Sequence, residues 1–508
     1  MEDLRDYGQN DNKDTEGRSI KSGLLWKAAE NGGDQLITFI VSVVLARLLG
    51  PDRYGSLSLM LVFVAISNVI IQSGFQTSLI QKRMINEDDL SSVFWIGLLL
   101  SLLIYAVLYV LAPYAADYFG DQEIGPMLRV LALILFFGSV ISVEMAIVAR
   151  RMCFRLQCAA TMAADVVSGI GGIILALLGY GTWALVWQQV IKYMLLMLAL
   201  LFLIGWRPGL RFSMSRIRSL FSFGWKMLVS GLIDTIYNNL YTPVIQKLFS
   251  SAAVGYYNRG NQFPQIIANS VGQTMQAVML PAFSKVQDDR ESLEKLLRNT
   301  IKISCYLMFP MMAGLMAVSG DLIELLLGEA WQPAAPMLSL CCLSYAAWPM
   351  HVANLQAINA RGRSDIYLKL EVVKKGMGVA VLIMSAGRGI AMMLIFKAVF
   401  DLCCTFINAA PNGRLLGYGP FRQWRDVLPE LLLSIGMGLA VHMLGSVLGG
   451  LDLLAGAGAL GQATILFIEV VFGVLIYAAG SLLLGLEGFY ALKGIFLGRE
   501  ETGKDSRR

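Results

Sequence analysis

Charged residues inside long apolar runs are the side chains of this sequence with the clearest chemical potential. The stretches DQLITFIVSVVLARLLGPDRYG, from Asp34, and DTIYNNLYTPVIQKLFSSAAVG, from Asp234, each place a basic residue thirteen positions after the Asp and a Gly eight beyond it. A charge at the centre of a membrane helix costs about 2.5–3.5 kcal/mol, so it usually faces a cavity or an opposite charge. The two acids are therefore candidates for binding a coupling cation or proton, or for pairing with lysines.

Basic residues in or beside the apolar runs form a second candidate set, for binding an anionic substrate. A charged, hydrated head group cannot cross hydrocarbon unaided, so its path needs cationic lining. We interpret Lys192 as part of a polar helix face that lines a cavity. Lys27 and Lys226 could instead extend to water at the inner interface, and Arg47 and Lys247 could anchor outer helix ends. The substrate-binding candidates are Lys27, Arg47, Lys192, Lys226, Lys247 and Arg259.

Other ionisable residues in the apolar runs have simpler interpretations. Lys397 and Asp401 are four residues apart, which predicts an ion pair on one helix face. Glu144 lies close enough to an inner helix end to extend towards water. Asp165 and Glu469 complete the set, without an assigned role.

Patterns typical of metal, nucleotide or redox chemistry are missing from the sequence. It contains no GxxxxGK[ST] loop, and its two histidines, His351 and His442, lack metal-binding spacing. The seven cysteines show no CxxC spacing and lie in predicted helices, which is typical of small apolar packing residues. We therefore expect no metal, no cofactor and no catalytic residue.

The elements that must position these residues are membrane helices. The chain of 508 residues is 56% hydrophobic and only 15% charged, and runs of 18 or more apolar residues recur throughout. Each is long enough to cross a hydrocarbon core of about 30 Å. The predicted spans lie near 22–46, 55–78, 93–112, 127–149, 158–178, 182–204, 222–248, 262–284, 301–320, 333–358, 366–386, 389–410, 427–448 and 463–485.

The distribution of Lys and Arg predicts the orientation of these spans. With a cytoplasmic N-terminus, 33 of the 41 basic residues fall on the inner side, which places both termini in the cytoplasm. The net charge of +5 then reflects topology and contact with anionic inner-leaflet lipids, and not nucleic-acid binding. The inner stretch 285–302 carries apolar residues at helical spacing, which predicts an interfacial amphipathic helix, and 211–221 is a second candidate.

The matched stretches also predict an internal repeat. They start six spans apart, so both run outward, and Val44/Val244 and Leu48/Leu248 are identical besides the Asp and Gly. This indicates an all-α polytopic membrane protein of about fourteen transmembrane helices, with two parallel-repeat six-helix lobes around a central cavity plus a C-terminal helix pair. The predicted parts are a disordered cytoplasmic tail at 1–21, an N-lobe at 22–206, a C-lobe at 207–411, helices thirteen and fourteen at 412–497, and a cytoplasmic tail at 498–508.

Several stretches resemble a known family over nearly the whole chain, from about residue 22 to 413. LARLLGPDRYGSLSLMLVFVAISNVIIQSGFQTSLIQ and VGYYNRGNQFPQIIANSVGQTMQAVMLPAFSKVQDDRE, followed by LMFPMMAGL and LIELLLGEAW, are similar to Wzx-like polysaccharide flippases of the multidrug/oligosaccharidyl-lipid/polysaccharide exporter superfamily. The likeness is closest to colanic-acid and teichuronic-acid type exporters. YYNRGNQFP also resembles a cavity-lining stretch of lipid II flippases, which implies that Arg259 contacts the substrate diphosphate, with Phe263 and Pro264 completing the motif.

This resemblance implies a flippase, not an enzyme. It would move an undecaprenyl-diphosphate-linked oligosaccharide across the bacterial inner membrane for cell-surface polysaccharide synthesis, by ion-coupled alternating access. Its implied partners are the lipid-linked oligosaccharide, a coupling cation or proton, membrane lipids and, as a further candidate, polysaccharide polymerase machinery. A multidrug or cation antiporter of the same superfamily stays an alternative. A membrane-embedded glycosyl polymerase is a weaker one, because the outer loops are too short to hold a catalytic domain.

Overall fold

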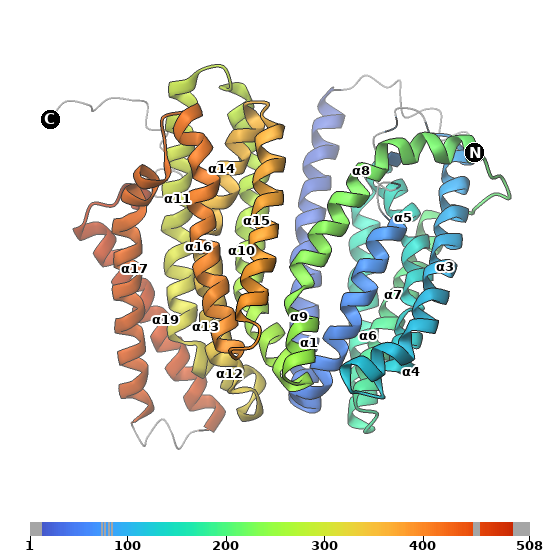
Figure 1. Ribbon diagram of the computed structural model, residues 1–508, viewed down its shortest axis with the longest axis horizontal. Helices are drawn as coiled ribbons and strands as arrows, with labels where there is room; N and C mark the ends of the chain where they lie inside the picture. Colours follow the sequence, from blue (N-terminus) through green and yellow to red (C-terminus); the bar gives the residue numbers. More distant parts are fainter. Residues whose placement is uncertain are drawn as a thin grey trace. The chain divides into compact units, whose positions relative to one another are not determined.

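The computed structural model describes residues 13–72, 75, 78–79, 82, 85–450 and 458–490, with side chains left out at 13–25, 27–29, 31, 219–220, 222–223 and 280 (Figure 1). Every regular element in this described part of the chain is a helix. The chain divides into two compact units, Met1–Gly255 and Tyr256–Arg508. We describe each unit by itself.

Unit 1 is built from helices that pack around the long first helix. α1 contacts α5, α6, α7, α8 and α9, and α6 packs against α7. Two apolar cores, one around Val143 and Trp206 and one around Ala164 and Leu200, lie between these helices. The helices are α1 (Lys13–Gln72), α3 (Glu87–Phe119), α4 (Ile124–Leu131), α5 (Ile134–Arg151), α6 (Phe154–Leu177), α7 (Thr182–Ile204), α8 (Met214–Asn239) and α9 (Tyr241–Leu248).

Unit 2 holds the remaining helices, which surround α11 and α16. α11 packs against α13, α14 and α17, and α19 packs against α17. The helices are α10 (Ser251–Lys285, whose first turn belongs to unit 1), α11 (Arg290–Ala317), α12 (Ser319–Leu327), η2 (Glu329–Trp331), α13 (Ala334–Ala346), α14 (Trp348–Ala360), α15 (Ser364–Ser385), α16 (Ile390–Leu415), α17 (Pro420–Gly449) and α19 (Gly458–Leu483).

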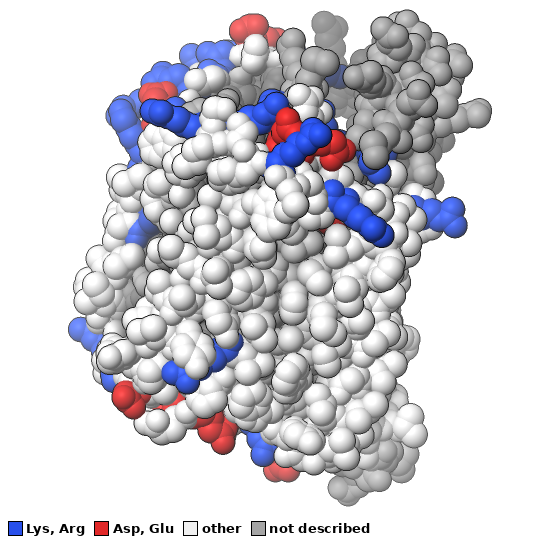
Figure 2. Space-filling view, turned by 90° about the vertical axis from the view of Figure 1, so that its right-hand side faces the viewer, with Lys and Arg blue, Asp and Glu red and all other residues white. Residues whose placement is uncertain are grey.

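The helices have the length and apolar surface of membrane spans. Within the described residues, nine helical segments are long and apolar enough to cross a membrane. On the face shown in Figure 2, charged side chains gather towards two ends, and a belt of uncharged side chains separates them. Such a belt suits hydrocarbon, where helices satisfy their own backbone polar groups. The all-α polytopic fold is thereby confirmed, while the count of fourteen spans stays a prediction.

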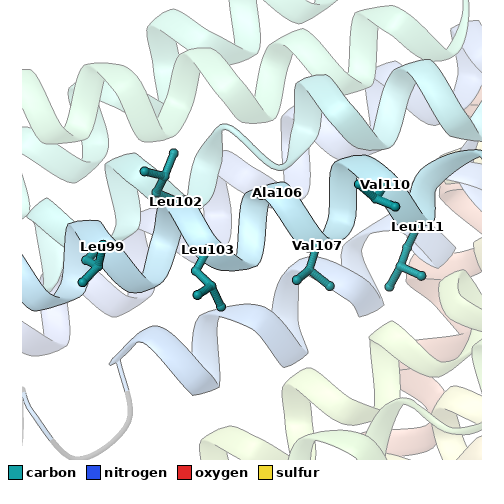
Figure 3. A pocket seen from close by; sticks show the side chains of 7 residues that line it. All are labelled: Leu99, Leu102, Leu103, Ala106, Val107, Val110 and Leu111. Atoms are coloured by element: carbon teal, nitrogen blue, oxygen red, sulfur yellow. The ribbon is translucent and has the colours of Figure 1, made fainter.

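One face of α3 shows the lipid-facing character most clearly. Seven apolar side chains follow one another along it and line an open hollow of about 640 Å³ (Figure 3). Most of these apolar side chains are exposed in the structure. In a membrane, this face would contact lipid instead of water. The lining residues are Leu99, Leu102, Leu103, Ala106, Val107, Val110 and Leu111.

Several predicted spans are two helices in the structure. The span at 127–149 is divided between α4 and α5, and that at 333–358 is divided at Ala347 into α13 and α14. Within the predicted span at 222–248, one helix (α8) ends at Asn239 and another (α9) begins at Tyr241. Pro349 and Pro243 stand in the first turns of α14 and α9, where a missing backbone N–H costs no helical hydrogen bond. The breaks at Leu240 and Ala347 thus precede prolines that the predicted spans ran across.

The prediction of a separate amphipathic helix at 285–302 is wrong. α11 begins at Arg290 and continues to Ala317, and its Leu293 and Leu297 are fully buried in the core of unit 2. Asp289 caps this helix by accepting hydrogen bonds from the amides of Glu291 (3.0 Å) and Ser292 (3.3 Å). The hydrogen bonds from the Ser292 side chain and amide hold the pKa of Asp289 below its usual value. The second candidate, 211–221, merges into α8 in the same way.

The start of the chain differs from expectation, and the two compact units are not divided where the predicted lobes are. α1 begins at Lys13, so residues 13–21 are helical turns and not a disordered tail, while residues 1–12 lie outside the described residues. α8 and α9, predicted to open the second lobe, group with unit 1 because they pack against α1 and α3. The repeat boundary at 206/207 is a statement about sequence and stays a prediction.

Candidate functional site

Three helices of unit 1 bring two acids and a lysine into one cluster. Lys192 of α7 forms an ion pair with Asp165 of α6, and its Nζ lies 3.3 Å from Oδ1 of Asp34 of α1. The Asp165 side chain is 2% exposed, whereas those of Lys192 and Asp34 are 20% and 35% exposed. The cluster therefore has a buried acid at its base and reaches the surface of unit 1 through Asp34.

Small residues on α6 allow the three helices to approach closely enough for these contacts. A side-chain carbon on Gly172 would lie 2.8 Å from Cβ of Gln188 in α7, and one on Gly169 would overlap Val41 of α1. Glycine at both positions lets α1 and α7 pack directly on the α6 backbone. Asp165 then lies within reach of both neighbouring helices.

Glu30 extends this polar cluster by one turn of α1. Its Oε1 accepts hydrogen bonds from Nε2 of Gln157 (2.8 Å) and, more weakly, from the Thr161 hydroxyl (3.5 Å). Glu30 is 5% exposed, so a carboxyl group is buried between α1 and α6 here as well. Glu30 was not predicted from the sequence. Its spacing was the available signal, because Glu30 and Asp34 are four residues apart on α1, and Gln157, Thr161 and Asp165 repeat at the same interval on α6.

The charge balance of the cluster favours binding of a small cation. Two carboxylates face one ammonium group, and Oδ2 of Asp165 is buried without a hydrogen-bond partner among the described residues. A buried oxygen without a donor is costly, and a proton or a cation would satisfy it. The arrangement is therefore suited to holding a proton in competition with the lysine.

Arg259 lies in unit 2, near the start of α10. It is 8% exposed, and its Nη1 donates a 2.6 Å hydrogen bond to Oε1 of Gln262 one turn later. The helix is held against α13 at Gly260, where a side-chain carbon would meet the Leu338 amide nitrogen at 2.8 Å. The guanidinium is thus positioned on a firmly packed helix, and a group of this kind can donate several hydrogen bonds to a phosphate.

The remaining predicted substrate-binding residues are spread over unit 1. Lys247 of α9 donates to the backbone oxygen of Tyr118 in α3, with its Nζ 4.0 Å from the Tyr118 ring centre, so it fits the helix-anchor alternative. Lys226, Asp234 and Arg47 are exposed on α8, α8 and α1. The Lys27 side chain lies outside the described residues. Of the predicted substrate-binding residues of unit 1, Lys192 therefore contacts Asp34, whereas Lys247 packs against α3.

Two further charged side chains within predicted spans, Lys397 and Glu144, have defined surroundings in the structure. Lys397 and Asp401 form the expected ion pair on α16, at 2.9 Å, which confirms their structural pairing. The expectation that Glu144 extends towards water is wrong, because it is fully buried in α5 and neither carboxyl oxygen has a hydrogen-bond partner among the described residues. Neighbouring helices cover this turn of α5, which a single-helix view cannot reveal.

Comparison with known proteins identifies the family. Residues 44–336, more than half of the chain, match the family described as "Polysaccharide biosynthesis protein". The chain belongs to this family. Among curated relatives, it is 26% identical to the succinoglycan biosynthesis transport protein ExoT of Rhizobium meliloti (strain 1021), over 64% of this chain and 66% of that protein. It is 23% identical to the lipopolysaccharide biosynthesis protein WzxC of Escherichia coli (strain K12), over 83% and 88%.

Solved structures of membrane transporters have a similar fold. The lipid II flippase MurJ in an inward closed conformation matches with a TM-score of 0.72 at 13% identity, over 94% of this chain and 100% of that one. An inward-facing multidrug resistance MATE transporter of the MOP superfamily matches with a TM-score of 0.57 at 14% identity, over 74% and 92%. The resemblance to Wzx-like flippases is confirmed. This family member is a membrane transporter of polysaccharide biosynthesis and not an enzyme.

Proposed function

We propose that the chain is a flippase that moves an undecaprenyl-diphosphate-linked oligosaccharide across the bacterial inner membrane, driven by a cation or proton. The family membership, the relatives named for succinoglycan transport and lipopolysaccharide biosynthesis, and the MurJ-like fold support this substrate class. Cytoplasmic termini and contact with polymerase machinery belong to the same proposal.

The contact that carries ion coupling is the ion pair between Lys192 and Asp165. Lys192 contacts both acids, and Asp165 keeps one oxygen without a donor among the described residues. When a proton or cation binds the acids, attraction between them and Lys192 weakens. The ammonium group then becomes available for a diphosphate. Ion binding and substrate binding are thereby linked through one lysine, and reciprocity requires that substrate also favours ion binding.

The substrate-binding residues of this proposal are Arg259 and the lysines predicted from the sequence. A guanidinium can offer two parallel donors to phosphate oxygens, whereas an ammonium acts as a point charge. Lys192 would supply the switchable charge and Arg259 the directional contact. Lys27, Arg47, Lys226 and Lys247 would contribute attraction along the path, with Asp234 as a second acid for ion coupling.

A multidrug or cation antiporter is the second candidate function, favoured by the MATE-like fold over 74% of the chain. An acid-rich cluster suits cationic substrates, but the many basic candidates suit an anionic one. Purified protein in liposomes separates the two. Flipping of a fluorescent undecaprenyl-diphosphate oligosaccharide, measured by quenching of outer-leaflet probe, supports the flippase, and uptake of a cationic dye without flipping supports the antiporter.

The test of coupling compares Asp165→Asn with Asp365→Asn. Asp365 forms a surface ion pair with Arg363 (2.9 Å), so its variant controls for a general loss of an acid. We expect Asp165→Asn to abolish the dependence of flipping on an imposed pH or sodium gradient, while Asp365→Asn keeps it. Gradient-dependent flipping that is unchanged in Asp165→Asn would exclude this acid from coupling.

A further inference from the structure

Glu469 is a buried acid in the middle of an otherwise uncharged helix. α19 (Gly458–Leu483) contains no other charged residue, and Glu469 is 1% exposed. Its Oε2 has no hydrogen-bond partner among the described residues. An ionised carboxylate in this position would be buried without compensation, which is prohibitively unfavourable in an apolar helix bundle. The side chain therefore needs a positive ligand, and a proton is the smallest one.

A second carboxyl group reaches the same place from another helix. A side-chain carbon on Gly445 of α17 would overlap Oε1 of Glu469 and would lie 3.8 Å from Oδ2 of Asp321 in α12. Both carboxyl groups thus border the space that glycine leaves empty. Asp321 comes from α12, the space at Gly445 lies on α17, and Glu469 comes from α19.

The groups around this pair leave it short of positive charge. Glu324, one turn after Asp321, accepts hydrogen bonds from Gln332 (2.7 Å) and Gln462 (2.6 Å), and the bond from Gln462 joins α12 to α19. His442 of α17 lies close enough to interact electrostatically with Asp321. From α11, Tyr306 contacts α19 at Tyr477, two turns beyond Glu469. No lysine or arginine is among these neighbours.

We propose that Asp321 and Glu469 form a proton-binding carboxyl pair in the C-terminal helices. Two carboxylates this close in an apolar environment cannot both stay ionised, so one bound proton neutralises the pair. Loss of that proton leaves two like charges between α12 and α19 and weakens the packing of α19 against Gly445. Proton occupancy thereby controls how tightly α19 packs against α12 and α17 within unit 2. This site is separate from the Asp34–Lys192–Asp165 cluster and does not depend on the substrate.

Infrared spectroscopy of the purified full-length protein in lipid nanodiscs tests the pair directly, because a protonated carboxyl group has its own C=O band. We expect a band that disappears as pH rises and that is missing in Glu469→Gln. In Asp321→Asn the band of Glu469 should disappear at a pH lower by about one unit or more, because the like charge that favours the proton is gone. Glu144→Gln, at a buried acid of unit 1, is the matched control and should leave this titration unchanged.

The proposal is overturned if Glu469→Gln leaves every carboxyl band in place, or if Asp321→Asn does not move the titration of Glu469. It is also overturned if the Glu469 band persists unchanged from acidic to strongly alkaline pH, which would describe a permanently neutral structural acid. If Glu469→Gln does not fold, Asp321→Asn alone decides, because Glu469 is intact in that variant. Sodium added at constant pH should not replace the proton, and loss of the band on adding sodium would assign the pair to a metal cation instead.

Discussion

Gly55 and Gly255, which occupy matching positions of the sequence repeat, pack reciprocally within unit 1. A side-chain carbon on Gly55 would overlap the backbone of Ser251, and one on Gly255 would overlap the backbone of Pro51. Pro51 and Ser251 are themselves 200 residues apart, as the glycines are. The contact is thus the same on both sides, as two repeats related by a two-fold axis would make it. It requires glycine because backbone meets backbone directly.

Gly55→Ala and Gly255→Ala should therefore each destabilise unit 1. An added methyl group cannot displace a backbone carbonyl cheaply, and overpacking of this kind typically costs about 1–3 kcal/mol. Thermal unfolding of the purified protein in detergent should show a lower midpoint for both variants. Gly436→Ala is the matched control, because a side-chain carbon there has no neighbour within 4 Å. Midpoints equal to that of the control would mean that the two backbones are not in contact.

Variants of the Asp34–Lys192–Asp165 cluster should change both the stability of the protein and its flipping activity. Lys192→Met should destabilise the protein by about 3 kcal/mol, because it leaves a buried acid without its counter-charge. Adding Asp165→Asn to Lys192→Met should restore much of that stability, because the uncompensated charge is gone. Flipping should not return in the double variant. Unfolding midpoints and flipping rates of both single variants and the double variant measure these effects, and rescue of both properties would make the cluster purely structural.

The sequence predicted the all-α membrane fold and the pairing of Lys397 with Asp401, since both follow from short-range periodicity. It also found Asp34, Asp165 and Lys192, but not that they meet. Their contact depends on Gly169 and Gly172, whose close packing against α1 and α7 is a property of three helices together. Glu30 was missed although its four-residue spacing from Asp34 was visible in the sequence. The approach of Glu469 to Asp321 could not be predicted, because the two acids lie on different helices. The helix breaks at Leu240 and Ala347 were not predicted, because each predicted span ran without interruption across the proline that follows the break.

The role of Lys247 can be decided from its contact with Tyr118. If Lys247 anchors α9 to α3, then Lys247→Gln and Tyr118→Leu should have similar, small effects on stability that do not add in the double variant. An exposed cation–π contact is worth about 0.5–1 kcal/mol, so flipping should fall little. Unfolding midpoints and flipping rates of the two single variants and the double variant provide the measurement. A large loss of flipping in Lys247→Gln alone would instead place this lysine on the substrate path.

The proposed orientation predicts which positions an impermeant thiol reagent can reach. With Cys153 and Cys403 replaced by Ser to remove thiols that are not fully buried, Asp288→Cys should stay unlabelled in intact cells and become labelled after permeabilisation. Asp288 lies just before α11, in the stretch predicted to be cytoplasmic. Asp117→Cys, near the end of α3 predicted to be outer, is the opposite control. Strong labelling of position 288 in intact cells would reverse the orientation.

Arg259 offers the sharpest test of substrate binding. Arg259→Ala removes charge-assisted hydrogen bonds worth roughly 1.5–3 kcal/mol each, so flipping should fall at least tenfold. Arg259→Lys keeps the charge and loses the two-donor geometry, so it should restore only part of the activity.

The alternative role for Arg259 is local. The observed hydrogen bond to Gln262 could simply stabilise the start of α10. Gln262→Ala removes that bond while keeping the guanidinium, and it is the matched control for a structural role. Surface polysaccharide measured in cells that express equal amounts of each variant separates the roles. Substrate binding predicts a severe defect in Arg259→Ala, an intermediate one in Arg259→Lys and near-normal activity in Gln262→Ala. Equal, small defects in Arg259→Ala and Gln262→Ala would remove Arg259 from the binding site.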